Sequence, residues 1–145
     1  MEYMLLAIEE AKKTLALGEI PVGAVIVRQG KVIATGYNTR ESDADITGHA
    51  EINAIRGAAK ALNDWRLTDC TIFVTLEPCA MCAGAILQSR MEALVFGAYD
   101  TAGGCCGSVY DLAAQGELGT LKIAGGVMEA ECLALLQNFF TQKRQ

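Results

Sequence analysis

The stretch CTIFVTLEPCAMCAGAILQSRMEALVFGA, residues 70–98, decides the fold. Its two ends, Cys70–Leu76 and Ala93–Ala98, are short apolar runs of the kind that form buried central strands. Pro78 ends the first run, and the apolar spacing over 81–91 predicts a helix between the two strands. This stretch therefore predicts two buried strands that are joined by a helix.

Further strands and helices are predicted on both sides of this unit. They are a helix over 4–15, strands over 22–27 and 32–37, a helix over 50–62, a strand over 121–124 and a helix over 129–142. Gly18 is expected to end the first helix, and Gln29-Gly30 to form the turn of a hairpin. The order αββαβαβ, followed by β and α, predicts a mixed sheet with helices on both faces.

Length and composition indicate one domain over residues 1–145. The hydrophobic fraction is 52%, so a core can form without disulfides, although the chain has 6 cysteines. No apolar run approaches the roughly 20 residues of a membrane span, and the N-terminus lacks the basic start of a signal peptide, so we expect a cytoplasmic protein. The net charge of −5 argues against broad affinity for nucleic acids but leaves room for a local basic patch.

Three residues have the spacing of a catalytic zinc site. His49 is the only histidine, and His49-Ala50-Glu51 begins a predicted helix. Cys79 and Cys82 lie three residues apart at the start of another helix, which points both sulfurs to one side and favours thiolates. One imidazole and two thiolates supply three ligands of a tetrahedral Zn²⁺ ion and leave the fourth position to water.

Glu51 lies beside these ligands without being needed as one. Zinc lowers the pKa of its bound water to roughly 7, so a hydroxide is available at neutral pH. Glu51 can take the proton of that water and pass it to a ring nitrogen and then to a leaving amine. The pairing of H-x-E with P-C-x-x-C is the signature of zinc deaminases of nucleobases.

Two other readings of the cysteines stay open at this point. A Cys-x-x-Cys after a strand also occurs as a thioredoxin-like redox pair. A structural zinc site would take a fourth ligand from Cys70, Cys105 or Cys106. Neither reading accounts for Glu51 or Pro78.

The segment TLEPCAMCAGAI, residues 75–86, together with the upstream HAE, resembles the tRNA-specific adenosine deaminase family of bacteria. The similarity extends over nearly the whole chain, and further matching segments are 20–25, 36–38, 65–67, 95–98 and 136–145. The resemblance implies a cytidine-deaminase-like three-layer α/β/α sandwich with a mixed five-stranded sheet. It also implies a homodimer with one Zn²⁺ per subunit, which converts the wobble adenosine of a tRNA anticodon loop to inosine.

The same resemblance assigns roles to single residues. His49, Cys79 and Cys82 match the zinc ligands, Glu51 matches the proton shuttle, and Asn38, Ala50 and Pro78 match positions that contact the substrate. Read by itself, Asn38 offers a donor and an acceptor that suit a purine edge, but an asparagine in this place can equally cap a turn.

Several loops depart from the family pattern. Ile46 and Gly48 stand where a proline and an alanine are usual, and the segment 101–107 lacks a common lysine. The tRNA anticodon loop stays the leading prediction for the substrate. These departures and the acidic composition are the reason for an alternative, a free base, a nucleoside or a related small heterocycle. The basic residues that could contact phosphate are Arg40, Arg66, Arg90, Lys143 and Arg144. A candidate dimer face carries Ile86, Leu87 and Met91, which can also be ordinary core residues.

Overall fold

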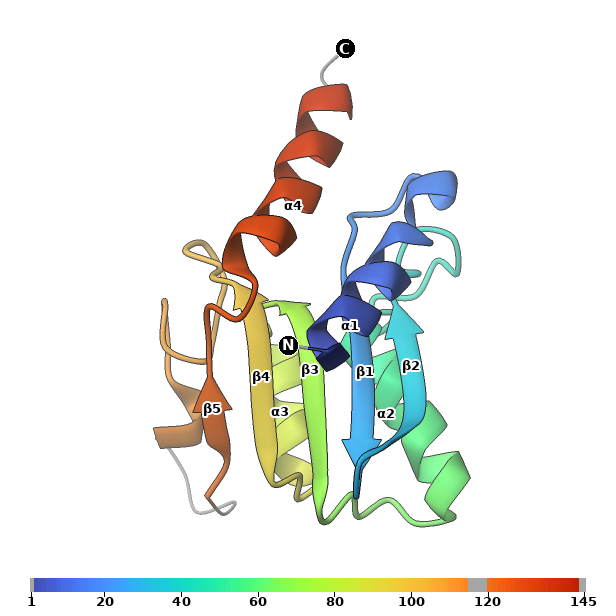
Figure 1. The fold of residues 1–145 in the computed structure, drawn as a ribbon, viewed down its shortest axis with the longest axis vertical. Helices are drawn as coiled ribbons and strands as arrows, with labels where there is room; N and C mark the ends of the chain where they lie inside the picture. The colour runs from blue at the N-terminus through green and yellow to red at the C-terminus, as the bar shows by residue number, and fades with distance from the viewer. Residues whose placement is uncertain (1, 115–119, 144–145) are drawn as a thin grey trace.

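The computed structural model describes residues 2–114 and 120–143, which form a five-stranded sheet between helices (Figure 1). The helices are α1 (Glu2–Lys12), α2 (Ala50–Leu62), α3 (Ala80–Gln88) and α4 (Glu129–Lys143). The strands are β1 (Gly23–Arg28), β2 (Lys31–Tyr37), β3 (Cys70–Leu76), β4 (Ala93–Ala98) and β5 (Lys122–Ala124). Two short 3-10 turns, Leu15–Leu17 and Leu112–Ala114, complete the described elements.

The sheet is mixed, as the order of elements predicts. Its strand order is β2-β1-β3-β4-β5, with β1 antiparallel to both of its neighbours and β3, β4 and β5 parallel to one another. Gln29 and Gly30 have φ values of 52° and 76°, so both lie in the left-handed region that a two-residue type I′ hairpin needs. The hairpin and the two inner strands of the stretch 70–98 are therefore confirmed.

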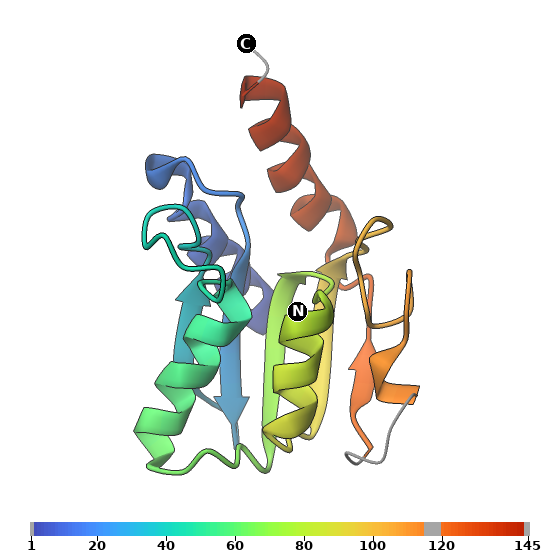
Figure 2. The ribbon, with the colours of Figure 1, turned by 180° about the vertical axis from the view of Figure 1, so that it is seen from behind.

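The helices cover both faces of the sheet, which confirms the three-layer arrangement (Figure 2). One core lies between the sheet and helices α2 and α3, and its largest buried side chains include Ile72, Ile86 and Phe96. A second, smaller core joins α1 to α4 through Met4 and Cys132. Helices α2 and α3 thus share one layer, with their N-termini at the same edge of the sheet.

A glycine in β2 sets how closely α2 approaches the sheet. A Cβ atom on Gly36 would lie 2.3 Å from the backbone oxygen of Ala50, far inside van der Waals contact. Only glycine leaves room for this approach, because it has no side chain. The first turn of α2 is therefore seated directly on β2.

Two helices end earlier than the sequence predicts. Helix α3 stops at Gln88 instead of residue 91, because the Ser89 hydroxyl donates to the Ile86 carbonyl at 2.8 Å and Arg90 turns to a φ of 66°. Helix α1 stops at Lys12 and is followed by the 3-10 turn, after which Gly18 adopts the left-handed conformation expected of it.

Ile86, Leu87 and Met91 do not form the dimer face that the sequence offered as a candidate. Ile86, Leu87 and Met91 have exposed fractions of 0%, 8% and 5%, since their side chains point into the protomer. They are core residues and offer no surface to a second chain.

Helix α4 projects beyond the sheet (Figure 1). The predicted apolar side of this helix is only partly covered, because Leu133 and Phe140 remain 39% and 43% exposed. Among the described residues, none of the helices has the length and apolar character that crossing a membrane requires.

Candidate active site

Two of the predicted metal ligands are the residues at which helices begin. His49 is the N-cap of α2, Cys79 is the N-cap of α3, and both have extended backbones. Cys82 and Glu51 lie in the first turns of the same two helices. The free N–H groups of a first helical turn carry a partial positive charge that favours thiolates and carboxylates. The two helix starts therefore bring the four predicted groups together in an electropositive setting.

The distances between these side chains fit a tetrahedral ion. The Nδ1 atom of His49 lies 3.7 Å from the sulfur of Cys79 and 3.4 Å from that of Cys82. Zinc bonds of about 2.3 Å to sulfur and about 2.0 Å to nitrogen would place these atoms about 3.5 Å apart at a tetrahedral angle. All three ligand atoms lie within 4.8 Å of one another, and in the described part of the chain no fourth residue joins the group. Cys70, Cys105 and Cys106 therefore do not supply the fourth ligand that a structural zinc site would need.

The pKa values of Cys79 and Cys82 are also consistent with a site that binds a cation. Hydrogen bonds from Cys82 and His49 lower the pKa of Cys79 to about 3. The hydrogen bond to that thiolate raises the pKa of Cys82, and burial raises it further. The hydrogen bond to Cys79 also raises the pKa of His49. Protein groups alone thus stabilise one thiolate, and a divalent cation would stabilise both.

Glu51 is buried beside the ligands and is not part of the ligand group. Its side chain is 4% exposed, and burial raises its pKa to about 7. A carboxyl with such a pKa can both accept and release a proton near neutral pH, which is what a general acid–base group must do. The structure therefore places a carboxyl suited to proton transfer beside the predicted ligands, and its role as the proton shuttle stays a prediction.

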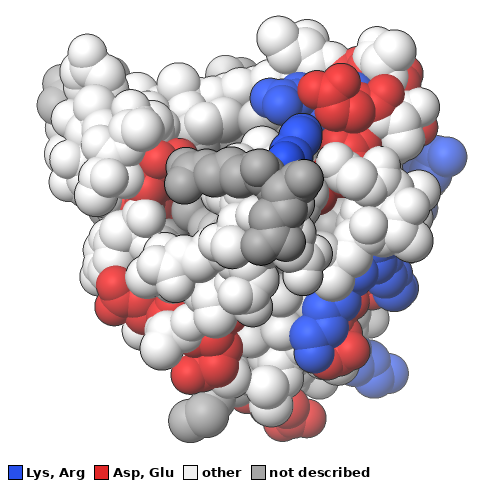
Figure 3. All heavy atoms as spheres, turned by 90° about the horizontal axis from the view of Figure 1, so that it is seen from above, with Lys and Arg blue, Asp and Glu red and all other residues white. Residues whose placement is uncertain are grey.

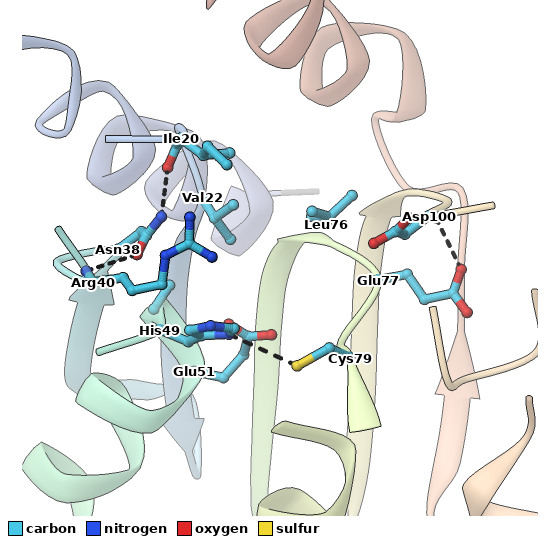
Figure 4. A pocket seen from close by; sticks show the side chains of 11 residues that line it. Ile20, Val22, Asn38, Arg40, His49, Glu51, Leu76, Glu77, Cys79 and Asp100 are labelled. Carbon is cyan, nitrogen blue, oxygen red and sulfur yellow. Dashed lines mark hydrogen bonds between the residues drawn. The ribbon is translucent and has the colours of Figure 1, made fainter. Parts of the chain in front are cut away.

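A pocket of about 130 Å³ opens above this group (Figure 4). Its lining residues come from both sides of the helix starts and are Ile20, Val22, Asn38, Arg40, His49, Ala50, Glu51, Leu76, Glu77, Cys79 and Asp100. Two predicted contact residues, Asn38 and Ala50, line it. Pro78 is buried and its carbonyl accepts a hydrogen bond from the Cys105 N–H, so its contact with substrate stays a prediction.

Asn38 caps a turn and also lines the pocket, while its contact with a base stays a prediction. Its side-chain oxygen accepts the Arg40 N–H at 3.0 Å, as in an Asx turn, and its amide donates to the Ile20 carbonyl at 3.1 Å. The amide group has a second N–H and the oxygen a second lone pair. Asn38 is thus fixed by the turn and still faces the pocket.

Three acidic residues near the pocket escape the sequence analysis. Glu77, Asp100 and the buried Glu19 hold the surroundings of the pocket through backbone hydrogen bonds. The only signal in the sequence is an acidic residue, Glu77, directly after an apolar strand. The hydrogen bonds of Glu77 and Glu19 join segments more than 20 residues apart, which local patterns do not reveal.

The basic residues do not form one surface. Arg40 lines the pocket, whereas Arg66 and Arg90 lie over the ring of Trp65, which precedes β3 at the opposite edge of the sheet. Lys143 lies over the ring of Phe139 on α4, and Arg144 lies outside the described residues. In the view from above, lysines and arginines are confined to one half of the face and have acidic residues among them (Figure 3).

A larger groove adjoins the pocket. It has a volume of about 600 Å³ and runs between the end of β4 and helix α4. Ile20, Leu76 and Asp100 line both the pocket and the groove, so these residues form a common border between them. Tyr99 and Phe140 face the groove with 46% and 43% of their surface exposed.

The chain is similar to known deaminases along its whole length. The sequence model of the MafB19-like deaminase family matches residues 1–144. A tRNA-specific adenosine deaminase of Bacillus subtilis (strain 168) is 46% identical over 144 residues, which are 99% of this chain and 89% of the relative. A tRNA-specific adenosine deaminase of Haemophilus influenzae is also 46% identical, over 99% of this chain and 84% of the relative.

Solved structures give the same result for the fold. One comes from biochemical and structural studies of A-to-I editing by tRNA:A34 deaminases at the wobble position of transfer RNA. It superposes with a TM-score of 0.89 at 39% identity and covers 93% of this chain and 99% of its own. A guanine deaminase from Bacillus subtilis superposes with a TM-score of 0.66 at 38% identity over 79% of this chain and 68% of its own.

Proposed function

This chain belongs to the MafB19-like deaminase family, and on that premise we propose that it converts the wobble adenosine of a tRNA anticodon loop to inosine. Its deaminase relatives make it an enzyme that hydrolyses a C–N bond. One observation carries the choice of substrate: the small pocket above Glu51 lies directly beside the large groove along α4, and the two share three lining residues.

The metal in this proposal is Zn²⁺, held by His49, Cys79 and Cys82. Two thiolates and an imidazole are ligands that zinc prefers, and the measured separations suit its bond lengths. Bound zinc supplies a water of lowered pKa as the nucleophile. Glu51 accepts one proton from the attacking water and delivers it to the ring nitrogen of the base. It then takes the proton of the hydroxyl group now bonded to the ring carbon and delivers it to the amine, so that ammonia leaves as the carbonyl forms.

The groove supports a polymeric substrate. A base in a tRNA loop is presented by a chain that continues on both sides of it, so the enzyme needs room for the flanking nucleotides. Tyr99 and Phe140 offer exposed rings on which such nucleotides can stack, and Arg40 offers a positive charge at the pocket. The pocket alone would hold the adenine.

The experiment uses the purified chain loaded with zinc and an anticodon stem-loop that carries adenosine at the wobble position. We expect inosine at that position and nowhere else in the loop, read by sequencing of the product. A stem-loop with adenosine moved to a neighbouring position is the matched control and should stay unchanged. Zinc-loaded protein that leaves the wobble adenosine intact would rule out this substrate.

A second candidate function is deamination of a free base or nucleoside. The similarity to a guanine deaminase at 38% identity and the small volume of the inner pocket favour it. Ammonia release from adenine, guanine, cytosine and their nucleosides tests it directly. Turnover of one of these at a rate that exceeds turnover of the stem-loop would favour the small substrate.

The homodimer and the cytoplasmic location are parts of the same proposal. The resemblance to the family supports a dimer, and light scattering of the purified protein should give the mass of two chains. All six cysteines are free, and a site built on two thiolates is preserved in a reducing compartment. Bacterial tRNA is found in the cytoplasm, where such conditions hold.

A further inference from the structure

Two loops form opposite walls of the pocket, and each is held by a buried carboxylate. The first loop, residues 39–48, contributes Arg40, and the second, residues 100–108, contributes Asp100. Figure 4 shows Arg40 on one side of His49 and Asp100 on the other. Neither loop belongs to a helix or strand, so each needs other contacts to keep its shape.

Glu77 holds the second loop. Its carboxylate accepts the N–H groups of Asp100, Cys106 and Ser108 at 3.0–3.1 Å and also the Ser108 hydroxyl. The side chain is 2% exposed and points toward the backbone of Asp100 (Figure 4). Burial opposes its ionisation, but the hydrogen bonds outweigh this and hold its pKa below the ordinary value. The negative charge of Glu77 therefore stabilises the loop and does not act on the metal or the substrate.

The backbone of the second loop also packs directly against this carboxylate. A Cβ atom on Gly104 would lie 2.4 Å from the carboxyl carbon of Glu77, so only glycine fits there. The Cys105 N–H donates to the Pro78 carbonyl at 2.9 Å, which ties the loop to the segment that carries Cys79. The position of the second wall is thus fixed relative to the metal ligands.

Glu19 holds the first loop in the same way, by accepting hydrogen bonds from its backbone. It is 1% exposed and accepts the N–H groups of Glu41 and Ser42 at 3.1 and 2.6 Å. Burial opposes its ionisation, and the backbone of Ser42 and Glu41 reverses that effect, so its pKa is also lowered. The neighbouring Ile20 and Arg40 both line the pocket.

We propose that Glu19 and Glu77 are positioning residues for deamination, each of which sets one wall of the pocket and so determines how well the substrate is held. Neither residue takes part in proton transfer or metal binding. Because the walls meet the substrate outside the reacting ring, their displacement weakens binding more than the chemical step. The kinetic part of this inference rests on the proposed function, while the structural part does not.

The kinetic test compares Glu77→Gln and Glu19→Gln with Glu9→Gln. Glutamine keeps the shape of the side chain but places an NH₂ group where backbone donors need an acceptor. Glu9 is an exposed carboxylate that pairs only with Lys12, so its variant is the matched control. We expect the KM for the stem-loop to rise about tenfold in both test variants, with kcat changed less than about threefold and zinc content unchanged.

Amide hydrogen exchange, followed by NMR, locates the effect. Glu77→Gln should speed exchange at Cys106 and Ser108 but not at Glu41 and Ser42, and Glu19→Gln should do the reverse. If both sets of amides exchange faster in either variant, the carboxylates support the fold as a whole and the proposal is wrong. Unchanged KM values would also overturn it.

A milder variant covers the case in which a buried substitution prevents folding. Ser108→Ala removes the one side-chain donor to Glu77 at an exposed position and should raise KM about twofold to threefold. A KM equal to that of the wild type in this variant would contradict the role of Glu77. If the wild type shows no activity on RNA, the proposed substrate fails, and the exchange experiment still decides the role of both carboxylates.

Discussion

The floor and the walls of the pocket are built in different ways. The floor consists of His49, Glu51, Cys79 and Cys82, which stand on the first turns of two helices that pack on the sheet. The walls are two loops whose backbone N–H groups donate hydrogen bonds to buried carboxylates. Secondary structure and core packing hold the floor in place, whereas a few hydrogen bonds hold each wall in place.

This difference separates chemistry from substrate choice. The departures from the family pattern fall on the walls, at Ile46, Gly48 and residues 101–107, and leave the floor intact. Ile46 is 77% exposed, and a Cβ atom on Gly48 would lie 3.0 Å from the Thr39 hydroxyl. Ile46 thus has room to vary, whereas Gly48 is closely packed, and the following experiments test how far the walls and the floor are independent.

The largest effect is expected from loss of a metal ligand. Cys82→Ala should lose its zinc and its deaminase activity together, because two ligands hold zinc far less tightly than three. Zinc content by elemental analysis and inosine formation measure the two losses. Cys132→Ala is the matched control, since Cys132 is a buried cysteine of the other core, and it should keep its metal. Retention of zinc in Cys82→Ala would refute the ligand assignment.

The next effect concerns proton transfer on the same floor. Glu51→Gln should lower kcat by about 10²–10⁴-fold, because a general acid–base group contributes this much to the rate. The variant should keep one zinc per chain, since Glu51 is not a ligand. Single-turnover kinetics on zinc-loaded protein measure the loss. Normal activity in this variant would mean that another group moves the proton.

A smaller effect, on the stability of the fold, is expected at the contact between helix α2 and strand β2. Gly36→Ala places a methyl group against the backbone of Ala50 and should destabilise the protein by about 1–3 kcal/mol, the usual cost of overpacking. Urea denaturation measures the change. Gly84→Ala is the control, because its Cβ meets nothing within 4 Å, and it should be neutral or stabilise helix α3 by up to about 1 kcal/mol.

The smallest effect is expected for Glu19, which holds the first wall, as the change of its contribution to the free energy of unfolding with pH. A group whose pKa is lowered by folding stabilises the protein above its unfolded pKa and loses that contribution as the pH falls through its folded pKa. Glu19, with an ordinary value of 4.5, is such a group. The difference in unfolding free energy between wild type and Glu19→Gln should be about 1 kcal/mol at pH 7 and shrink below pH 4.5. A difference that grows in acid would contradict the assignment.

Several elements are predictable because local patterns specify them. The strands Cys70–Leu76 and Ala93–Ala98 and the helix Ala50–Leu62 agree with the sequence analysis residue for residue. The end of α3 is not predictable, because one hydroxyl and one left-handed residue stop a helix whose apolar spacing continues. The partial exposure of Phe140 likewise depends on where α4 leaves the sheet, which its own sequence does not specify.

The sequence by itself was enough to predict the ligand set and the proton shuttle, because His49 with Glu51 and Cys79 with Cys82 each have a spacing that fits within one helical turn. Only the tertiary structure decided how the walls stand around them. Glu19 meets Ser42 across 23 residues and Glu77 meets Ser108 across 31, and such contacts exist only after the sheet has brought distant segments together. Their energy comes from burial of a charge among backbone donors, and no local pattern of residues records that environment.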